Sequence, residues 1–157
     1  MSIMRYDRGM TQEPEELIAS TGYLLARVGA ESRRMWARML AEHGLTPQHF
    51  GVLMVLDQLG ASSQRRLSRG IGVDPRNAVP VIDLLQRREL VERRADPADR
   101  RRHAVALTPG GRDLLERLRR DGEAVERRLL DSLTESERLD LHRILRKLLD
   151  GLDPERP

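Results

Sequence analysis

The chain has 157 residues, a formal net charge of +3 and no cysteine. This length allows one domain with short extensions, and the missing cysteine excludes disulfides and thiol-based redox sensing. No apolar run approaches the roughly 18 residues that a membrane span needs, and the N-terminus lacks the apolar core of a signal peptide. We therefore expect a soluble, cytoplasmic protein.

The positive charge is unevenly distributed along the chain. Residues 61–107 hold eleven arginines and six acidic residues, a net charge of +5, whereas the segments before and after them each carry −1. A local excess of positive charge is typical of a nucleic-acid-binding segment.

The N-terminal part of the chain predicts a flexible arm and two helices. Residues 1–13 are polar and without periodicity, which is typical of an arm. Over residues 14–44, apolar residues recur at helical spacing from Pro14 until Gly44 ends the pattern, so we expect one long helix. Thr46 and Pro47 form the next helix start, and Gly60 is its stop signal. The residues of this second helix expected to point inward are Phe50, Leu53, Leu56 and Leu59.

The next two predicted helices are short and separated by a glycine. Ser62 or Ser63 caps a helix over residues 64–71, and Gly72 ends it. Asp74 and Pro75 then give a second start signal for a helix running towards Leu90.

Pro80 leaves two possibilities open for this second helix. Proline lacks an N–H group, so in a helix that begins at Pro75 the hydrogen bond to the Arg76 carbonyl is lost and the helix kinks. Alternatively, the helix effectively begins at Asn77, whose side chain is then the cap and is not free to contact another molecule.

A β-hairpin follows. Apolar residues stand at alternate positions in two short segments, Val91 in the first and His103, Val105 and Leu107 in the second, around a turn cluster of Asp, Pro and Asp. Three consecutive arginines occupy the tip, residues 100–102. Exposed ion pairs add little to folding and clustered like charges repel, so this tip indicates a polyanionic partner.

Helix, glycine turn, helix and basic hairpin together predict a winged helix-turn-helix module over residues 45–107. In such modules the second helix enters the DNA major groove, and residues near its N-terminus contact base edges. Arginine suits guanine and asparagine suits adenine, which makes Arg76 and Asn77 candidates for base reading. If the helix begins at Asn77, the side chain of Asn77 is used as the cap, and Arg76 is the better candidate for base reading.

Two charged, amphipathic helices complete the chain. Thr108 and Pro109 start the first, and residues 134–137 form a capping box for the second. Their apolar stripes are too thin for a separate domain, so we expect residues 108–157, together with residues 14–44, to form the dimerisation helices of a homodimer. The predicted fold is mainly α with a small β-hairpin wing, a winged helix-turn-helix flanked by N- and C-terminal dimerisation helices.

Three motifs resemble the MarR family of transcriptional regulators. They are Leu45-Thr46-Pro47-Gln48-His49-Phe50, the wing tip Asp99-Arg100-Arg101, and Leu107-Thr108-Pro109-Gly110-Gly111. The resemblance covers roughly residues 17–152. It implies a homodimeric regulator, in our interpretation a repressor, that binds double-stranded DNA at an inverted-repeat operator and is released by a small aromatic or phenolic ligand. It also implies that Asp99 orients one arginine while another enters the minor groove.

The candidate DNA-binding residues lie on the helix-turn-helix and the wing. We expect phosphate contacts from the first of the two short helices and from Arg94 at the base of the wing, and minor-groove insertion by Arg101 or Arg100. The full set is Arg65, Arg66, Arg76, Asn77, Arg94, Asp99, Arg100, Arg101 and Arg102.

The sequence also allows a ligand crevice and two other functions. The candidate ligand-binding residues Trp36, Met39, His43, Phe50 and Met54 either line a crevice between the long helix and the winged module or belong to the core. The scattered histidines and the lack of nucleophile or phosphate-binding motifs predict no enzyme, no cofactor and no catalytic residue. The alternatives are a non-specific architectural DNA-binding protein and a metal-responsive regulator using Glu42, His43 and His49, whose spacing matches no common ligand pattern.

Overall fold

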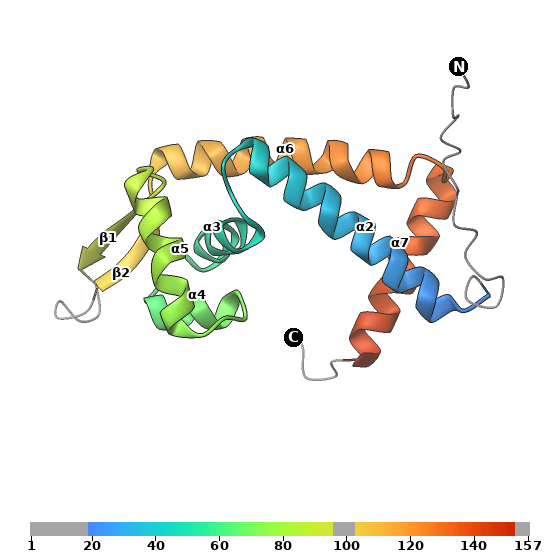
Figure 1. Ribbon diagram of the computed structural model, residues 1–157, viewed down its shortest axis with the longest axis horizontal. Coiled ribbons are helices and arrows are strands. Elements are labelled where there is room, and N and C mark those ends of the chain that lie inside the picture. Colours follow the sequence, from blue (N-terminus) through green and yellow to red (C-terminus); the bar gives the residue numbers. More distant parts are fainter. Residues whose placement is uncertain (1–18, 96–102, 153–157) are drawn as a thin grey trace, which may run out of the picture. The chain divides into compact units, whose positions relative to one another are not determined.

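The computed structural model describes residues 19–95 and 103–152. The predicted arm and the wing tip, with Asp99, Arg100, Arg101 and Arg102, lie outside the described residues. The elements in chain order are α2 (Thr21–Glu42), α3 (Pro47–Leu59), α4 (Gln64–Gly70), α5 (Pro75–Arg87), β1 (Val91–Ala95), β2 (His103–Leu107), α6 (Pro109–Leu129) and α7 (Glu135–Leu152) (Figure 1). The predicted fold class, helical with one hairpin, is confirmed.

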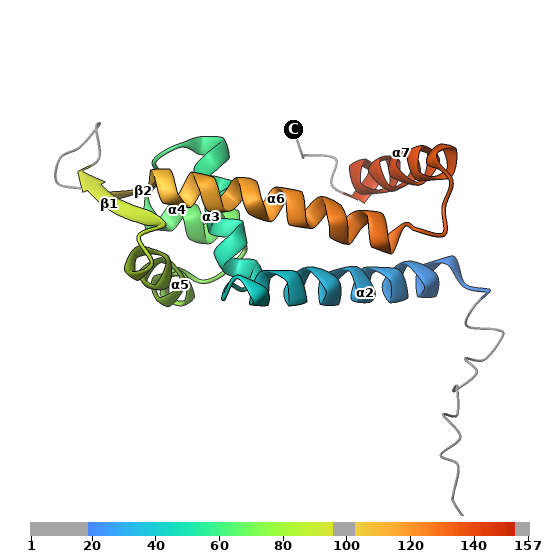
Figure 2. The same ribbon diagram turned by 90° about the horizontal axis from the view of Figure 1, so that it is seen from above.

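The chain divides into two compact units, residues 1–34 and 35–157, with the boundary inside α2. In the second unit, α3, α4, α5 and the hairpin gather at one end of α6 (Figures 1 and 2). No described helix is long and apolar enough to cross a membrane.

The two ends of α2 follow from local capping. Ser20 precedes the helix, and its carbonyl accepts from the Leu24 N–H (3.0 Å), so α2 begins at Thr21. The start of the predicted helix, residues 14–18, lies outside the described residues. At the other end Gly44 adopts a left-handed conformation with φ of +66°. The Leu45 N–H returns to the Leu40 carbonyl (2.9 Å), the pairing of a glycine-terminated helix end.

Side-chain caps start each of the next three helices. Thr46 caps α3, Ser63 caps α4, and Asp74 caps α5 by accepting from the Arg76 N–H at 2.8 Å. The second helix of the motif therefore begins at Pro75, and the helix continues past Pro80 to Arg87. This decides between the two starts that the sequence left open.

The hairpin is antiparallel, with Val91 opposite Leu107 and Ala95 opposite His103. On the other edge of β2, Ser62 exchanges two backbone hydrogen bonds with Val105, at 2.9 and 2.8 Å. All residues of β2 from Ala104 to Leu107 are buried. Burial therefore does not alternate along β2, since His103 is exposed and the four residues after it are buried.

The core collects apolar residues from every element between the end of α2 and the first half of α6. Its most deeply buried large side chains are Leu40, Val52, Leu53, Leu67, Ile82, Leu85, Val91, Leu115 and Leu118. Leu59, predicted to point inward, is 47% exposed because it occupies the last turn of α3. The remaining residues of that prediction, Phe50, Leu53 and Leu56, are partly or fully buried.

The C-terminal helices begin as predicted but differ in burial. Thr108 caps α6, and the predicted capping box at Thr134 is present, since its N–H donates to Glu137 Oε2 (2.8 Å). In α6, Leu114, Leu115 and Leu118 are buried. None of the described residues of α7 is buried, and its large apolar side chains Leu139, Ile144, Leu148, Leu149 and Leu152 are exposed.

Candidate nucleic-acid interface

Helix α5 has one buried side and one exposed side. Its buried residues Ala78, Val81, Ile82 and Leu85 follow helical spacing and pack into the core. The opposite side of the N-terminal half is therefore exposed to solvent. Four exposed residues form this surface, which we call the α5 face: Arg76, Asn77, Val79 and Pro80.

The Asp74 cap leaves the Asn77 side chain available. Because Asp74 Oδ1 binds the Arg76 N–H and the Asp74 carbonyl accepts from the Asn77 N–H (2.9 Å), the first turn of α5 does not need Asn77 as a cap. Neither Arg76 nor Asn77 uses its side chain in a hydrogen bond with another described residue. Both side chains are thus presented to solvent in a form that suits base edges.

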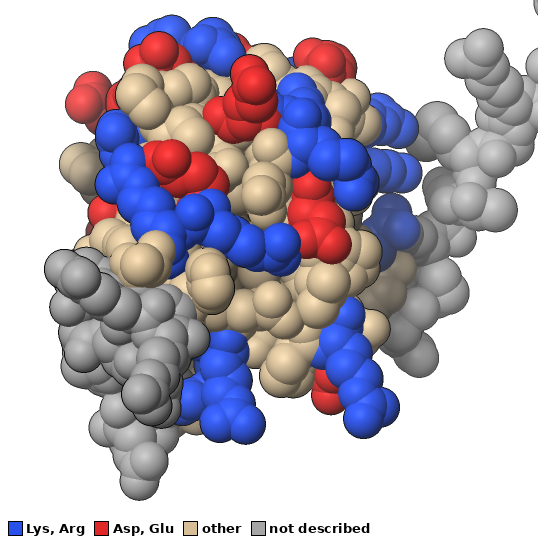
Figure 3. Space-filling model, turned by 90° about the vertical axis from the view of Figure 1, so that its left-hand side faces the viewer, with Lys and Arg blue, Asp and Glu red and all other residues tan. Residues whose placement is uncertain are grey.

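Helix α4 adds positive charge next to the α5 face. The two helices pack directly on each other, and Gln64 Nε2 donates to the Pro75 carbonyl (3.4 Å). Arg65, Arg66 and Arg69 are exposed, and the described part of the chain gives none of them an ion-pair partner. Figure 3, which faces the hairpin end, shows basic side chains projecting on either side of uncharged residues.

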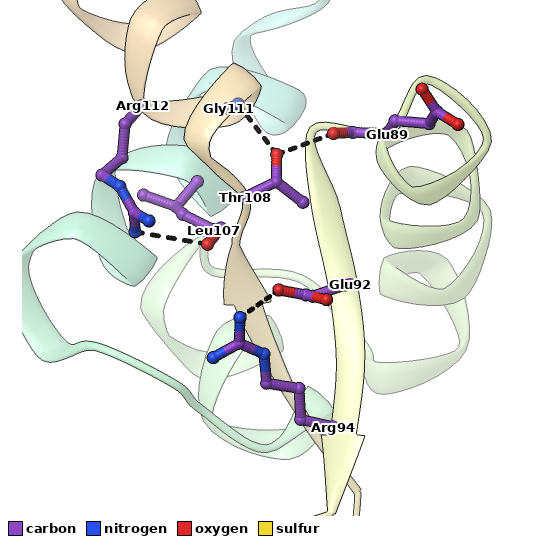
Figure 4. Close-up of polar contacts among 7 residues, drawn as sticks. All are labelled: Glu89, Glu92, Arg94, Leu107, Thr108, Gly111 and Arg112. Carbon is purple, nitrogen blue, oxygen red and sulfur yellow. Dashed lines mark hydrogen bonds and ion pairs between the residues drawn. The ribbon is translucent and has the colours of Figure 1, made fainter.

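The two arginines of β1 are paired with acidic side chains. Arg93 Nη2 lies 2.7 Å from Asp83 Oδ1 on α5, and Arg94 forms an ion pair with Glu92 (Figure 4). Arg94 is still 60% exposed, but Glu92 balances its charge. A phosphate contact by Arg94 therefore competes with this carboxylate.

Thr108 anchors the base of the hairpin to α6 (Figure 4). Its hydroxyl donates to the Glu89 carbonyl (2.7 Å) and accepts from the Gly111 N–H (3.0 Å). Arg112 Nη1 donates to the Leu107 carbonyl at 3.3 Å. These bonds hold both strands at their ends nearest the helices, so α6 positions the wing relative to α5.

Arg88 is a positioning residue that the sequence reasoning missed. It caps the C-terminal end of α5, and its Nη1 donates to the carbonyls of His43 (2.9 Å) and Gly44 (3.2 Å). These carbonyls lie at the C-terminal end of α2. The partners of Arg88 are more than 40 residues away in sequence. The one local signal for its role was that a basic residue stands at the end of a helix.

The predicted ligand-binding residues come together where the end of α2 meets α3 and α6. The Trp36 and Phe50 rings have centroids 5.5 Å apart, Met39 is buried, and Phe50 and Met54 are partly buried against the core. A Cβ on Gly122 would lie 2.4 Å from the Trp36 ring, so α6 fits closely against the indole. His43 Nε2 pairs with Asp121 Oδ2 at 2.8 Å. This packing agrees with the core interpretation of these residues.

His49 has a structural role in the α3 cap. Its Nδ1 accepts from the Thr46 N–H (3.0 Å), and the Thr46 hydroxyl lies 2.7 Å from the same atom. Burial, and then the nearby charge of Arg88, lower the pKa of His49 below its ordinary value. Among residues 19–95 and 103–152 no three His, Cys, Asp or Glu side chains gather in a way that suits a metal ion.

Comparisons with known proteins agree with this geometry. A family model described as the MarR family matches residues 43–102. The HTH-type transcriptional repressor Rv2887 of Mycobacterium tuberculosis is 34% identical over 130 residues, which covers 83% of this chain and 94% of the relative. These matched proteins are transcriptional regulators rather than enzymes.

Solved structures are similar over the same range. The structure of Rv2887 in complex with DNA has a TM-score of 0.72 at 32% identity, covering 83% of this chain and 98% of that one. The structure of Bordetella bronchiseptica BpsR, whose DNA binding is regulated by 6-hydroxynicotinic acid, has a TM-score of 0.68 at 30% identity, covering 88% and 99%. The chain therefore belongs to the MarR family of winged helix-turn-helix transcriptional regulators.

Proposed function

We propose that this regulator is a sequence-specific repressor that acts as a homodimer on an inverted-repeat operator in double-stranded DNA. The observation that carries the proposal is the α5 face, where Arg76 and Asn77 are exposed and not engaged in capping. Helix α4, which packs on α5, carries the exposed arginines Arg65, Arg66 and Arg69. A polar helix face next to a phosphate-binding surface is the arrangement by which helix-turn-helix proteins read DNA.

Each residue has a proposed role in this complex. Arg76 contacts guanine and Asn77 contacts adenine in the major groove. Arg65 and Arg66 contact phosphates, as does Arg94 when it leaves Glu92. In the wing tip, Asp99 orients an arginine, Arg100 or Arg101 enters the minor groove, and Arg102 adds positive charge.

The exposed apolar side chains of α7 support the homodimer. Leu139, Ile144, Leu148 and Leu149 are between 47% and 68% exposed, and a soluble monomer rarely leaves such a row uncovered. We assign this surface, with residues 14–44, to the partner copy. Two-fold symmetry then sets the recognition helices about 34 Å apart, one turn of DNA, and the operator becomes an inverted repeat.

The cluster of Trp36, Met39, His43, Phe50 and Met54 is the proposed place for a small aromatic effector. The regulation of BpsR by an aromatic acid supports this class of ligand. Arg88 supplies a connection, because it ties the end of α5 to the carbonyls of His43 and Gly44. A ligand that binds better when the end of α2 is displaced would shift α5 and weaken operator binding.

Selection of bound sequences from a random double-stranded DNA pool, at near-physiological salt, tests the proposal. We expect an enriched inverted repeat. Binding to the selected duplex should weaken about 10³- to 10⁵-fold between 50 and 200 mM salt if the dimer neutralises roughly six to ten phosphates. Salt-sensitive binding without enrichment would instead favour a non-specific architectural protein. Light scattering on the same sample measures the oligomeric state.

A further inference from the structure

Two apolar side chains interrupt the polar surface of the α5 face. Val79 is 36% exposed, and Pro80 is exposed as well. Pro80 lies one turn after Arg76 on the same side of the helix, and Val79 flanks it. The buried residues on both sides of the pair, Ala78 and Val81, show that the helix does not turn Val79 or Pro80 towards the core.

Folding alone does not account for these two residue types. A proline inside a helix removes a backbone hydrogen bond, here the one to the Arg76 carbonyl, and lowers stability. Valine is also a weaker helix former than most unbranched residues. Both side chains remain exposed at the N-terminal half of the helix, so their apolar surface is available to a ligand of this face.

The charged residues near Val79 and Pro80 indicate which class of ligand this surface binds. Arg76 lies one turn before Pro80 on α5, and α4, which packs on α5, carries further exposed arginines, a charge that suits double-stranded DNA as the ligand. On the major-groove edges of the four bases, the one apolar group is the 5-methyl group of thymine, and small apolar side chains contact it directly.

We propose that Val79 and Pro80 read a thymine in each half-site through its 5-methyl group. The inference rests on the proposed DNA-binding function. Four residues separate Arg76 from Pro80, a rise of about 6 Å along the helix axis. Successive bases are about 3.4 Å apart along one DNA strand. With the helix lying along the groove, the thymine is therefore about two base pairs from the base that Arg76 contacts.

Deoxyuridine provides the test, because it differs from thymidine only by the missing methyl group. In a duplex selected by the wild-type protein, each thymine is replaced in turn by deoxyuridine, in both half-sites together, and the dissociation constant is measured. We expect the affinity to fall about fourfold for each methyl group that is no longer buried, and hence roughly fifteenfold when both half-sites are changed. All other thymines that the protein contacts only through phosphates should be unaffected.

Protein variants assign the effect to the apolar pair. In Val79→Gln combined with Pro80→Gln, the dissociation constant for the deoxyuridine duplex divided by that for the thymidine duplex should fall below about twofold, because amide groups replace the apolar surface that covers the methyl group. Both substitutions introduce a strong helix former, so the variant should fold, which a melting curve verifies. Leu59→Gln is the matched control, since it replaces exposed apolar surface at the end of α3 by an amide and should leave this ratio unchanged.

The outcomes separate this inference from the proposed function. Two results would overturn the role of Val79 and Pro80 and leave the proposed function intact. In the first, the protein binds tightly and sequence-specifically, but no replacement of thymine by deoxyuridine changes the dissociation constant. In the second, the double variant still prefers thymine over deoxyuridine. Binding without any sequence preference overturns both.

Discussion

The carbonyl oxygen of Leu90 occupies the position that a side chain on Gly111 would need. A Cβ built on Gly111 would lie 2.0 Å from this oxygen. The same carbonyl accepts from the Thr108 N–H at 3.1 Å, so the chain entering the hairpin is held against the first turn of α6. The two backbones are in direct contact at this point, and a residue without a side chain is required.

Gly111→Ala should therefore destabilise the fold by about 3 kcal/mol, since a backbone carbonyl cannot move aside as a flexible side chain can. Gly110→Ala is the matched control, because its Cβ would meet Thr108 and Glu89 at 3.8 and 3.9 Å, ordinary contact distances. Urea denaturation measures both free energies of unfolding. Equal stability of the two variants would show that the hairpin shifts freely on α6.

The features that depend on neighbouring residues could be predicted from the sequence. Thr46, Ser63 and Thr108 all cap helices as expected, and Gly44 and Gly72 adopt the left-handed conformation that ends or turns the chain. Caps and glycine stops are interactions over three or four residues, so the sequence contains all of their partners.

The features that depend on distant residues could not be predicted. The backbone pairing of Val105 in β2 with Ser62 joins segments far apart in the sequence, and the need for glycine at position 122 comes from Trp36 on another helix. In the candidate site, the partners of Arg88 lie on α2, and no local pattern indicated them. The choice between Pro75 and Asn77 as the helix start depended on the orientation of one aspartate side chain.

Arg88→Ala should lower the free energy of unfolding by about 1–2 kcal/mol, because two carbonyls at the end of α2 lose a charged donor. Arg87→Ala is the control, since Arg87 is its exposed neighbour in α5 and its side chain makes no hydrogen bond to a described residue. Thermal and urea denaturation of the two variants provide the comparison. If both substitutions have the same small effect, the link between α5 and α2 does not contribute to stability.

Arg76→Ala and Arg65→Ala should weaken DNA binding in different ways. Arg76→Ala removes a bidentate base contact, so it should weaken binding to the selected duplex by about 1–3 kcal/mol and relax the base preference at one base pair of each half-site. Arg65→Ala removes a phosphate contact, so it should weaken binding to all sequences similarly and reduce the salt dependence of the affinity. Competition with single-base operator variants at two salt concentrations distinguishes the two patterns. Identical profiles would contradict the assignment of Arg76 to base reading.

The pKa of His49 is lowered in the folded protein by burial and by the charge of Arg88, which gives stability a pH dependence. The unfolded chain takes up a proton near the ordinary pKa of 6.5, whereas the folded chain does so only at lower pH. The contribution of neutral His49 is complete above pH 6.5 and is lost as pH falls towards the folded-state pKa. Gln at this position keeps the acceptor for Thr46 but does not titrate, so His49→Gln should lose less stability on going from pH 7.5 to 5.5. Parallel curves for the two proteins over this range would contradict the prediction.

Pro80→Ala should raise the free energy of unfolding by about 2 kcal/mol, because alanine restores the N–H group that can donate to the Arg76 carbonyl. Pro75→Ala is the control, since Pro75 is the first residue of α5 and its missing N–H has no partner within the helix. The expected pattern in denaturation experiments is a gain at position 80 and none at position 75. If Pro80→Ala also binds its operator less tightly, the proline lowers the stability of α5 while improving its contact with DNA. A stabilised variant with unchanged affinity would leave no functional reason for a proline at this position of the recognition helix.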